Sequence, residues 1–123
     1  MRVLVGTDII EISRVMKLVD SKEKNALKSI FTLREIEYCE ARKVSKYQSY
    51  AARFAAKEAI YKALSEFVPK NYKYTDFEVI NVEKGRPKVV LGFDIKGLES
   101  IEISLSHCKE YAVAYVTAII KEN

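Results

Sequence analysis

The sequence predicts an α+β domain, in which helices pack on one side of an antiparallel sheet. Residues 46–67 form one long helix by this prediction, since apolar side chains recur there at helical spacing, namely Ala52, Ala56, Ala59, Ile60, Ala63 and Phe67. Apolar and polar residues alternate along 101–106, the pattern of a half-buried strand. The Lys-Gly-Arg-Pro segment at 84–87 is typical of a hairpin turn between two strands.

Composition indicates an ordinary globular chain, with one domain spanning residues 1–123. Hydrophobic residues make up 49% and charged residues 31%, without an internal repeat, a low-complexity tract or a linker. The formal net charge of +4 favours an anionic partner without identifying it.

The same residues predict a cytoplasmic protein that does not enter a membrane. No apolar run is long enough to cross a bilayer, and the N-terminal segment reaches Asp8 too early for a signal peptide. Cys39 and Cys108 lack the spacing of a zinc or redox motif, so two free thiols in a reducing compartment are expected.

Near the N-terminus, residues 3–6 (Val-Leu-Val-Gly) predict a short buried strand, and Asp8 follows it directly. A carboxylate in this place has two interpretations. It accepts hydrogen bonds from nearby backbone N–H groups, which is the commoner case, or it holds a cation at the edge of a site. Ser13 is predicted as the N-cap of a helix from Arg14 to about Val19.

The segment 14–34 is rich in basic side chains, which include Arg14, Lys17, Lys24 and Lys28. A solvated helix surface is the simpler interpretation, and a docking surface for an acidic partner is the sharper one. Thr32 and Glu35 match a capping box, which predicts a second helix from about Leu33 to about Arg42.

Glu58 and Lys62 lie four residues apart on the long helix, so they share one face of it. Taken alone, this spacing predicts an exposed ion pair worth a few tenths of a kcal/mol. The alternative is a functional pair, which the rest of the chain must support.

The second half of the chain is predicted to consist of strands joined by turns. Strands are predicted near 77–82, at 88–91, at 101–106 and at 111–119. The last two are joined by a turn at 107–110, so Ser106 and His107 lie at their shared end. A lone histidine in such a place is more often structural than functional.

Five segments, in order along the chain, resemble the motifs of one family. They are GTDIIEISR (6–14), FTLREIEYC (31–39), RFAAKEAIYKA (53–63), GRP (85–87) and SLSH with the following YA (104–107 and 111–112). The family is the holo-acyl-carrier-protein synthases, the small 4′-phosphopantetheinyl transferases, and the resemblance covers nearly the whole chain. Arg86 stands where lysine is usual, and Tyr61 where phenylalanine or serine is familiar.

The resemblance implies the 4′-phosphopantetheinyl transferase fold and a reaction of fatty acid biosynthesis. In that reaction, phosphopantetheine passes from coenzyme A to a serine of an acyl carrier protein. Asp8 and Glu58 are the implied ligands of Mg²⁺, a hard cation that needs few carboxylates and keeps several waters. Lys62 is implied as the point charge that stabilises the departing phosphate. Glu58 and a metal-bound water are the two candidates for accepting the serine proton.

The resemblance also implies how the partners bind. The coenzyme A site would contain Arg53, Lys62, Gly85, Arg86, Pro87, Ser106 and His107. Arg53 and His107 would contact phosphates, and the turn at 85–87 would lie near the adenine. The chain would form a homotrimer with sites between subunits. Arg14, Lys17, Lys24 and Lys28 would dock the acidic carrier protein.

Two rival functions are a nucleic-acid-binding α+β module and a non-catalytic trimeric scaffold. The basic charge and the eight tyrosines favour the first superficially, but the tyrosines are scattered and no aromatic-basic RNA-binding run is present. The presence of Asp8, Glu58 and Lys62 together argues against the second.

Overall fold

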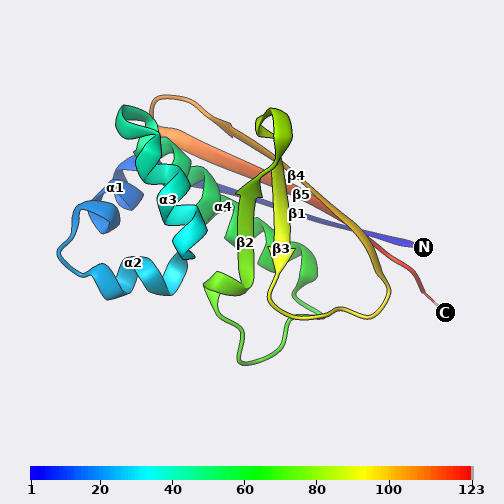
Figure 1. Cartoon of the computed structure of the whole chain (residues 1–123). Helices are drawn as coiled ribbons and strands as arrows, with labels where there is room; N and C mark the ends of the chain where they lie inside the picture. Colours follow the sequence, from blue (N-terminus) through cyan, green and yellow to red (C-terminus); the bar gives the residue numbers. More distant parts are fainter. Residues whose placement is uncertain (123) are drawn as a thin grey trace.

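The computed structural model describes residues 1–122, apart from the side chain of Glu83. Figure 1 shows the order of the elements along the chain. They are β1 (Arg2–Glu11), α1 (Ile12–Asp20), α2 (Lys24–Ile30), α3 (Leu33–Ala41), η1 (Lys43–Ser45), α4 (Lys46–Leu64), η2 (Tyr74–Asp76), β2 (Phe77–Asn81), η3 (Glu83–Gly85), β3 (Pro87–Leu91), β4 (Leu98–His107) and β5 (Tyr111–Ile120). None of the helices in this described part is long and apolar enough to cross a membrane.

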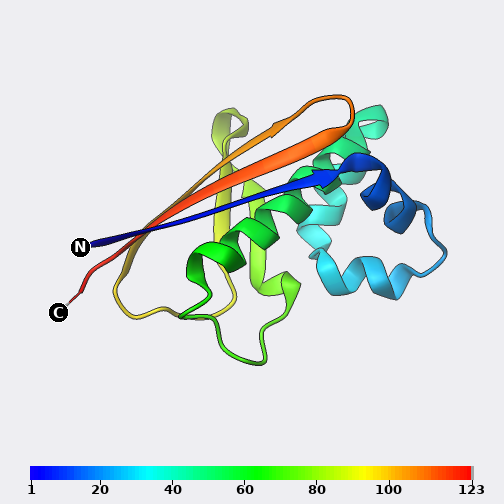
Figure 2. The ribbon, with the colours of Figure 1, turned by 180° about the vertical axis from the view of Figure 1, so that it is seen from behind.

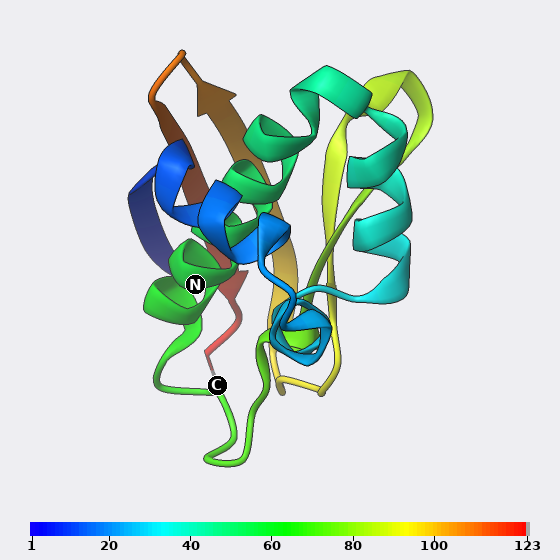
Figure 3. The same ribbon diagram turned by 90° about the vertical axis from the view of Figure 1, so that its left-hand side faces the viewer.

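The strands form two antiparallel sheets, which confirms the predicted α+β class but divides the sheet that was expected as one. The order of the larger sheet is β1-β5-β4, and β2 pairs with β3 in the smaller one. Helix α4 runs between the larger sheet and a layer made of α3, β2 and β3 (Figure 3). Arg2 pairs with Ile120, so the two termini lie together at the end away from α1 and α2 (Figure 2).

Helix α4 lies unusually close to strand β1 because small residues meet there. A Cβ atom added to Gly6 would lie 2.0 Å from the carbonyl oxygen of Ala59 and 2.9 Å from the backbone nitrogen of Ala63. Real Cβ atoms do not approach backbone so closely, so only glycine fits at position 6. This contact places the next residues of β1, which include Asp8, beside the last turns of α4.

Local sequence signals explain where several elements begin and end. Thr32 caps α3 and forms the predicted capping box with Glu35. The hairpin of β2 and β3 also confirms its prediction, and its turn contains Lys84 and Gly85 at positive φ angles of 64° and 73°. Glycine adopts this backbone conformation without a steric penalty.

Three local predictions were wrong. Strand β1 is ten residues long rather than four, and only alternate residues face the core, so Val3 and Val5 are 55% and 57% exposed. An edge strand needs only one apolar face, and the short apolar run concealed this alternation. Ser13 does not cap α1, which begins at Ile12 and continues β1 directly.

Two helix predictions also differ from the structure, one in a boundary and one in the number of helices. The long helix ends at Leu64 instead of Phe67, and the next residues form a turn in which the N–H groups of Phe67 and Val68 both donate to the carbonyl of Leu64. The basic segment forms two helices, α1 and α2, instead of one. The chain bends between them at residues 21–23, where the Ser21 hydroxyl and N–H both donate to the Leu18 carbonyl.

Candidate functional site

Asp8 and Lys62 form an ion pair where β1 passes α4. The Nζ atom of Lys62 lies 3.2 Å from Asp8 Oδ1 and also donates a 3.0 Å hydrogen bond to the carbonyl of Thr7. The Lys62 side chain is 55% exposed and that of Asp8 is 19% exposed. The pair therefore lies at the surface, where a ligand can reach it.

Glu58 lies one helical turn before Lys62 and is held by Tyr74. The Tyr74 hydroxyl donates a 2.7 Å hydrogen bond to Glu58 Oε1. This bond, together with burial and the nearby charges of Glu58 and Asp8, raises the pKa of Tyr74 to about 12. Asp8 contacts Lys62, which lies one helical turn after Glu58 on the same face of α4. The structure thus gathers Asp8, Glu58 and Lys62 into one acidic cluster.

The acidic cluster has the donor set of a site for a hard divalent cation. Asp8 Oδ2 and Glu58 Oε2 make no hydrogen bond within residues 1–122. No group of three or more His, Cys, Asp and Glu side chains that could hold a metal occurs in the same described part. Two carboxylates on separate elements match Mg²⁺, which proteins bind through one or two carboxylates while water and phosphate complete its coordination.

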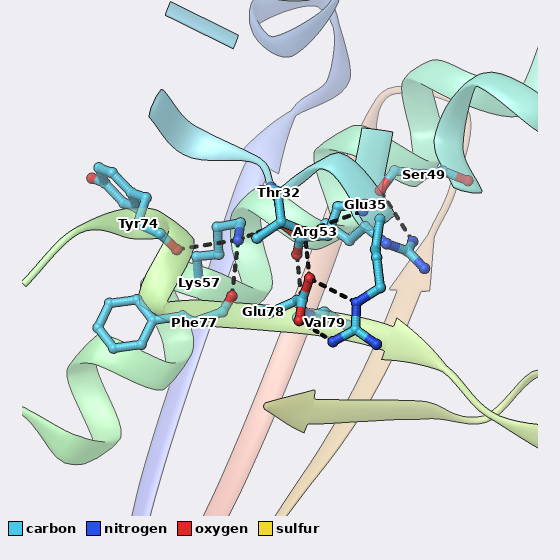
Figure 4. A network of polar contacts seen from close by, with 10 residues as sticks. Thr32, Glu35, Ser49, Arg53, Lys57, Tyr74, Phe77, Glu78 and Val79 are labelled. Atoms are coloured by element: carbon cyan, nitrogen blue, oxygen red, sulfur yellow. Dashed lines mark hydrogen bonds and ion pairs between the residues drawn. The ribbon is translucent and has the colours of Figure 1, made fainter. Parts of the chain in front are cut away.

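Lys57 precedes Glu58 in the sequence but points into the core (Figure 4). Its Nζ atom donates to Glu35 Oε1 at 2.7 Å and to the carbonyls of Phe77 at 2.9 Å and Tyr74 at 3.2 Å. Glu35 also accepts a 2.9 Å bond from the N–H of Val79. Burial lowers the pKa of Lys57, and the charge and hydrogen bond of Glu35 oppose that lowering. All three Lys57 donors are used, so this pair is structural.

A separate cleft of about 290 Å³ collects four of the residues implied in coenzyme A binding, namely Arg53, Gly85, Pro87 and His107. Its walls come from α4, from the hairpin of β2 and β3, and from the end of β4. The cleft also contains residues that sequence reasoning did not select, which include Tyr38, Gln48, Ser49 and Asn81.

Arg53 is only 3% exposed, and its surroundings hold it against one wall of this cleft. Its guanidinium donates to the side-chain oxygen of Asn81 and, at 3.5 Å, to the Ser49 carbonyl, and its central carbon lies 4.2 Å from the centre of the Tyr38 ring. The Nε atom is buried without a hydrogen-bond partner in the described chain. The cleft wall therefore carries a fixed positive charge, which suits an anionic ligand.

Three of the implied residues lie outside the lining of this cleft, namely Arg86, Ser106 and Lys62, the last of which pairs with Asp8. Arg86 is exposed, and its guanidinium lies 3.8 Å from the carboxylate of Glu102 on β4. Ser106 is exposed on β4 next to His107, but successive side chains of a strand point to opposite faces. The structure therefore keeps the turn and the end of β4 together while the side chains of Arg86 and Ser106 point elsewhere.

The acidic cluster and the cleft lie on opposite sides of α4. Lys62 follows Arg53 by nine residues, about two and a half helical turns, so the two side chains leave the helix about 180° apart and about 14 Å along it. Glu58 is displaced from Arg53 by about 140°. One chain therefore presents two separate groups of candidate residues.

The four basic residues Arg14, Lys17, Lys24 and Lys28, here called the basic surface, are all exposed on α1 and α2. Two of them, Lys24 and Lys28, border a hollow of about 310 Å³. Its apolar lining includes Val19, Leu27, Ile36 and Tyr50. The basic surface thus lies beside a hollow lined partly by apolar side chains.

Sequence reasoning missed Tyr74, Asn81 and Lys57. Helical spacing offered a signal for Lys57, since it shares a face of α4 with Arg53, Ile60 and Leu64. Tyr74 and Asn81 lie in short segments without periodicity, and their contacts with Glu58 and Arg53 span 16 and 28 residues. No local pattern could have identified them.

Comparison with known proteins assigns the chain to a family. The sequence model of the 4′-phosphopantetheinyl transferase superfamily matches residues 4–116. The chain therefore belongs to this superfamily, as its motifs predicted. It is similar to the holo-[acyl-carrier-protein] synthase of Ruminiclostridium cellulolyticum, with 46% identity over 121 residues that cover 94% of this chain and 90% of the relative.

Solved structures agree with this assignment. A holo-(acyl-carrier-protein) synthase from Bacillus anthracis, in complex with CoA (3′,5′-ADP), superimposes with a TM-score of 0.78 at 34% identity, covering 94% of both chains. The holo-[acyl-carrier-protein] synthase of Helicobacter pylori, in complex with coenzyme A, gives a TM-score of 0.82 at 28% identity, covering 94% of this chain and 100% of that one.

Proposed function

We propose that this chain, as a single domain spanning 1–123, transfers 4′-phosphopantetheine from coenzyme A to a serine of apo-acyl carrier protein. The products are holo-acyl carrier protein for fatty acid biosynthesis and adenosine 3′,5′-bisphosphate. The observation that carries the proposal is the convergence of Asp8, Glu58 and Lys62 from two distant segments. The names of its relatives and the coenzyme A in two similar structures support the same activity.

In this reaction the serine oxygen bonds to the phosphorus that carries pantetheine, and the pyrophosphate bond to the adenosine bisphosphate breaks. Negative charge grows on the departing phosphate, so a cationic group beside it lowers the barrier. Lys62 is the group we assign to that charge. Mg²⁺, held by Asp8 and Glu58, would neutralise charge on the pyrophosphate oxygens. The serine proton leaves as the new bond forms, and Glu58 or a metal-bound water would accept it.

Complete sites require two copies of the chain. The acidic cluster and the Arg53 cleft lie on opposite sides of α4, so the cluster of one copy and the cleft of another would enclose one coenzyme A. The outer face of the larger sheet provides a contact surface, because it exposes large apolar side chains, namely Val3, Val5, Ile9, Tyr111 and Tyr115. We propose a homotrimer with its sites between subunits.

Mixing two inactive variants tests this arrangement. Arg53→Ala damages the cleft and Asp8→Ala damages the acidic cluster, so each homogeneous protein should lose most of its activity. Mixed oligomers, formed by dilute unfolding and refolding of both variants together, should regain activity, because some sites then combine two intact halves. No recovery, with mixed oligomers demonstrated by mass spectrometry, would place the whole site within one chain.

The basic surface is the proposed docking site for the carrier protein, which is acidic in this family. Exposed charges of this kind act mainly on association and are screened by salt. Reversing Arg14 and Lys24 to glutamate should raise the KM for the carrier protein and leave that for coenzyme A unchanged. Equal effects on both substrates, or none on either, would exclude this surface.

We place the reaction in the cytoplasm. Cys39 and Cys108 are both free, one buried and one exposed, as a reducing compartment allows.

The direct test is mass spectrometry of an apo-carrier protein incubated with this protein, coenzyme A and Mg²⁺. We expect a mass gain of one phosphopantetheine group that disappears when a chelator removes the metal. A carrier protein with its target serine replaced by alanine is the matched control and should gain nothing. Failure to modify several acidic apo-carrier proteins would overturn the enzyme proposal and favour a non-catalytic role.

A further inference from the structure

Tyr74 connects the core of the protein to the acidic cluster. It opens the short turn η2, directly before β2, and its ring packs against Phe54 with the ring centres 5.8 Å apart. Its hydroxyl reaches Glu58 Oε1 at 2.7 Å. Tyr74 and Glu58 come from segments on either side of the long loop that follows α4, so this bond joins separate parts of the fold.

The backbone of Tyr74 is fixed from the buried side. Its carbonyl accepts a 3.2 Å hydrogen bond from Lys57, the lysine that pairs with Glu35 in the core. The turn is closed by Asp76, whose carboxylate accepts from the N–H of Lys73 at 2.9 Å and whose carbonyl accepts from the N–H of Gly92 at 2.8 Å. Tyr74 therefore approaches Glu58 from a rigid position.

Two adjacent residues of α4, Lys57 and Glu58, thus form hydrogen bonds with opposite ends of Tyr74. Lys57 binds its carbonyl, and its hydroxyl binds Glu58. A partly exposed glutamate otherwise samples many rotamers, and ordering it costs conformational entropy. A hydrogen bond from a fixed hydroxyl removes much of this freedom before any ligand arrives.

We propose that Tyr74 is a positioning residue, whose hydroxyl holds one oxygen of Glu58 and leaves the other oriented toward a divalent cation. The inference rests on the proposed function, since it takes Glu58 as a ligand of that cation. Partners that orient a ligand in this way typically change metal affinity by about 10–100-fold when removed. The ring of Tyr74 keeps its packing in Tyr74→Phe, so this variant removes the hydrogen bond alone.

The experiment measures Mn²⁺ binding to wild type and to Tyr74→Phe by electron paramagnetic resonance, in the presence of coenzyme A and without carrier protein. We expect about tenfold weaker binding in the variant. In the transfer assay, the Mg²⁺ concentration for half-maximal rate should rise similarly, while kcat at saturating Mg²⁺ stays near wild type. Tyr72→Phe is the matched control, because Tyr72 lies in the same connection between α4 and β2 but stacks on Tyr61, with ring centres 4.9 Å apart, instead of binding Glu58.

The outcomes separate this inference from the proposed function. Equal Mn²⁺ affinity in wild type and Tyr74→Phe would overturn the positioning role alone. Equal weakening in both tyrosine variants would also overturn it, because a general effect of removing a tyrosine hydroxyl from this segment would then explain the loss. Absence of Mn²⁺ binding by the wild-type protein with coenzyme A would overturn both. Denaturation by urea, measured for each variant, shows whether the fold is retained.

Discussion

Helix α4 carries two lysines five residues apart, and each forms an ion pair with a carboxylate from a distant segment. Lys57 and Glu35 are completely buried, whereas the side chains of Lys62 and Asp8 are 55% and 19% exposed. In the buried pair, every donor of the lysine has a protein partner. The exposed pair retains a carboxylate oxygen that bonds to nothing in the described chain.

The difference shows how one helix divides structural from functional charge. A buried charge without partners is strongly destabilising, so the fold must satisfy Lys57 completely and leaves it nothing to offer a ligand. An exposed ion pair adds little stability, so its groups can be exchanged for a substrate or a cation at small cost. The two pairs should therefore respond to mutation in opposite ways.

The largest expected effect is on stability. Lys57→Met should lower the free energy of unfolding by about 3–5 kcal/mol, because it leaves the Glu35 carboxylate buried without its cation. Urea denaturation followed by circular dichroism measures the loss. Adding Glu35→Gln to this variant should recover part of it, since the uncompensated charge is then removed. A loss below about 1 kcal/mol for the single variant would contradict the structural role.

Asp8→Asn should instead lower the activity and leave the stability nearly unchanged. We expect the transfer rate at ordinary Mg²⁺ to fall at least about 100-fold, about 2.7 kcal/mol of activation free energy, because a single charged carboxylate holds Mg²⁺ poorly. The free energy of unfolding should change by less than about 1 kcal/mol. Asp94→Asn, at another exposed aspartate, is the control and should change neither quantity. A near-normal rate would remove Asp8 from the metal site.

Lys62→Met tests the other half of the exposed pair and should have a smaller effect. We expect kcat to fall about tenfold, about 1.4 kcal/mol, since the charge beside the departing phosphate is lost. The matched control is Arg2→Met, which removes the exposed ion pair of Arg2 with Glu66. Both variants should unfold within about 1 kcal/mol of wild type. A loss of rate in both would indicate a general surface effect.

The smallest expected effect concerns Glu78, whose burial lies between those of the buried pair and the exposed pair. Burial alone would raise its pKa, but hydrogen bonds from Arg34 and Thr32 bring the pKa below the ordinary value of 4.5. Its stabilising contribution is therefore present above pH 4.5 and is lost as the pH falls through the lower value in the folded state. Glu78→Gln should be less stable than wild type at pH 7, by about 1 kcal/mol or less.

Unfolding at several pH values provides the check for Glu78. The difference between wild type and Glu78→Gln should shrink as the pH falls below 4.5, the ordinary value of a carboxyl group. A difference that stays constant or grows toward acid pH would show that the carboxylate is not preferentially stabilised in the folded protein. Glutamine has nearly the shape of glutamate without its charge, so Glu78→Gln measures what the charge contributes to stability.

Much of the fold could be predicted because local sequence carries its signals. The capping box of Thr32 is a contact between near neighbours, and the alanine spacing of α4 and the alternation along β4 follow the repeats of a helix and a strand. The length of β1 escaped prediction for the opposite reason. It extends because Arg2 through Glu11 pair along the whole of β5, a partner about a hundred residues away in the sequence.

The candidate site was likewise predictable only in part. The sequence by itself placed Glu58 and Lys62 on one face of a helix, because a four-residue spacing determines that face, and its motifs identified Asp8 and the cleft residues as candidates. Only the tertiary structure decided that Asp8 meets Lys62, that Tyr74 holds Glu58 and that Asn81 holds Arg53. These contacts depend on how β1, α4 and β2 pack, and side-chain packing between distant segments leaves no periodic trace in the chain.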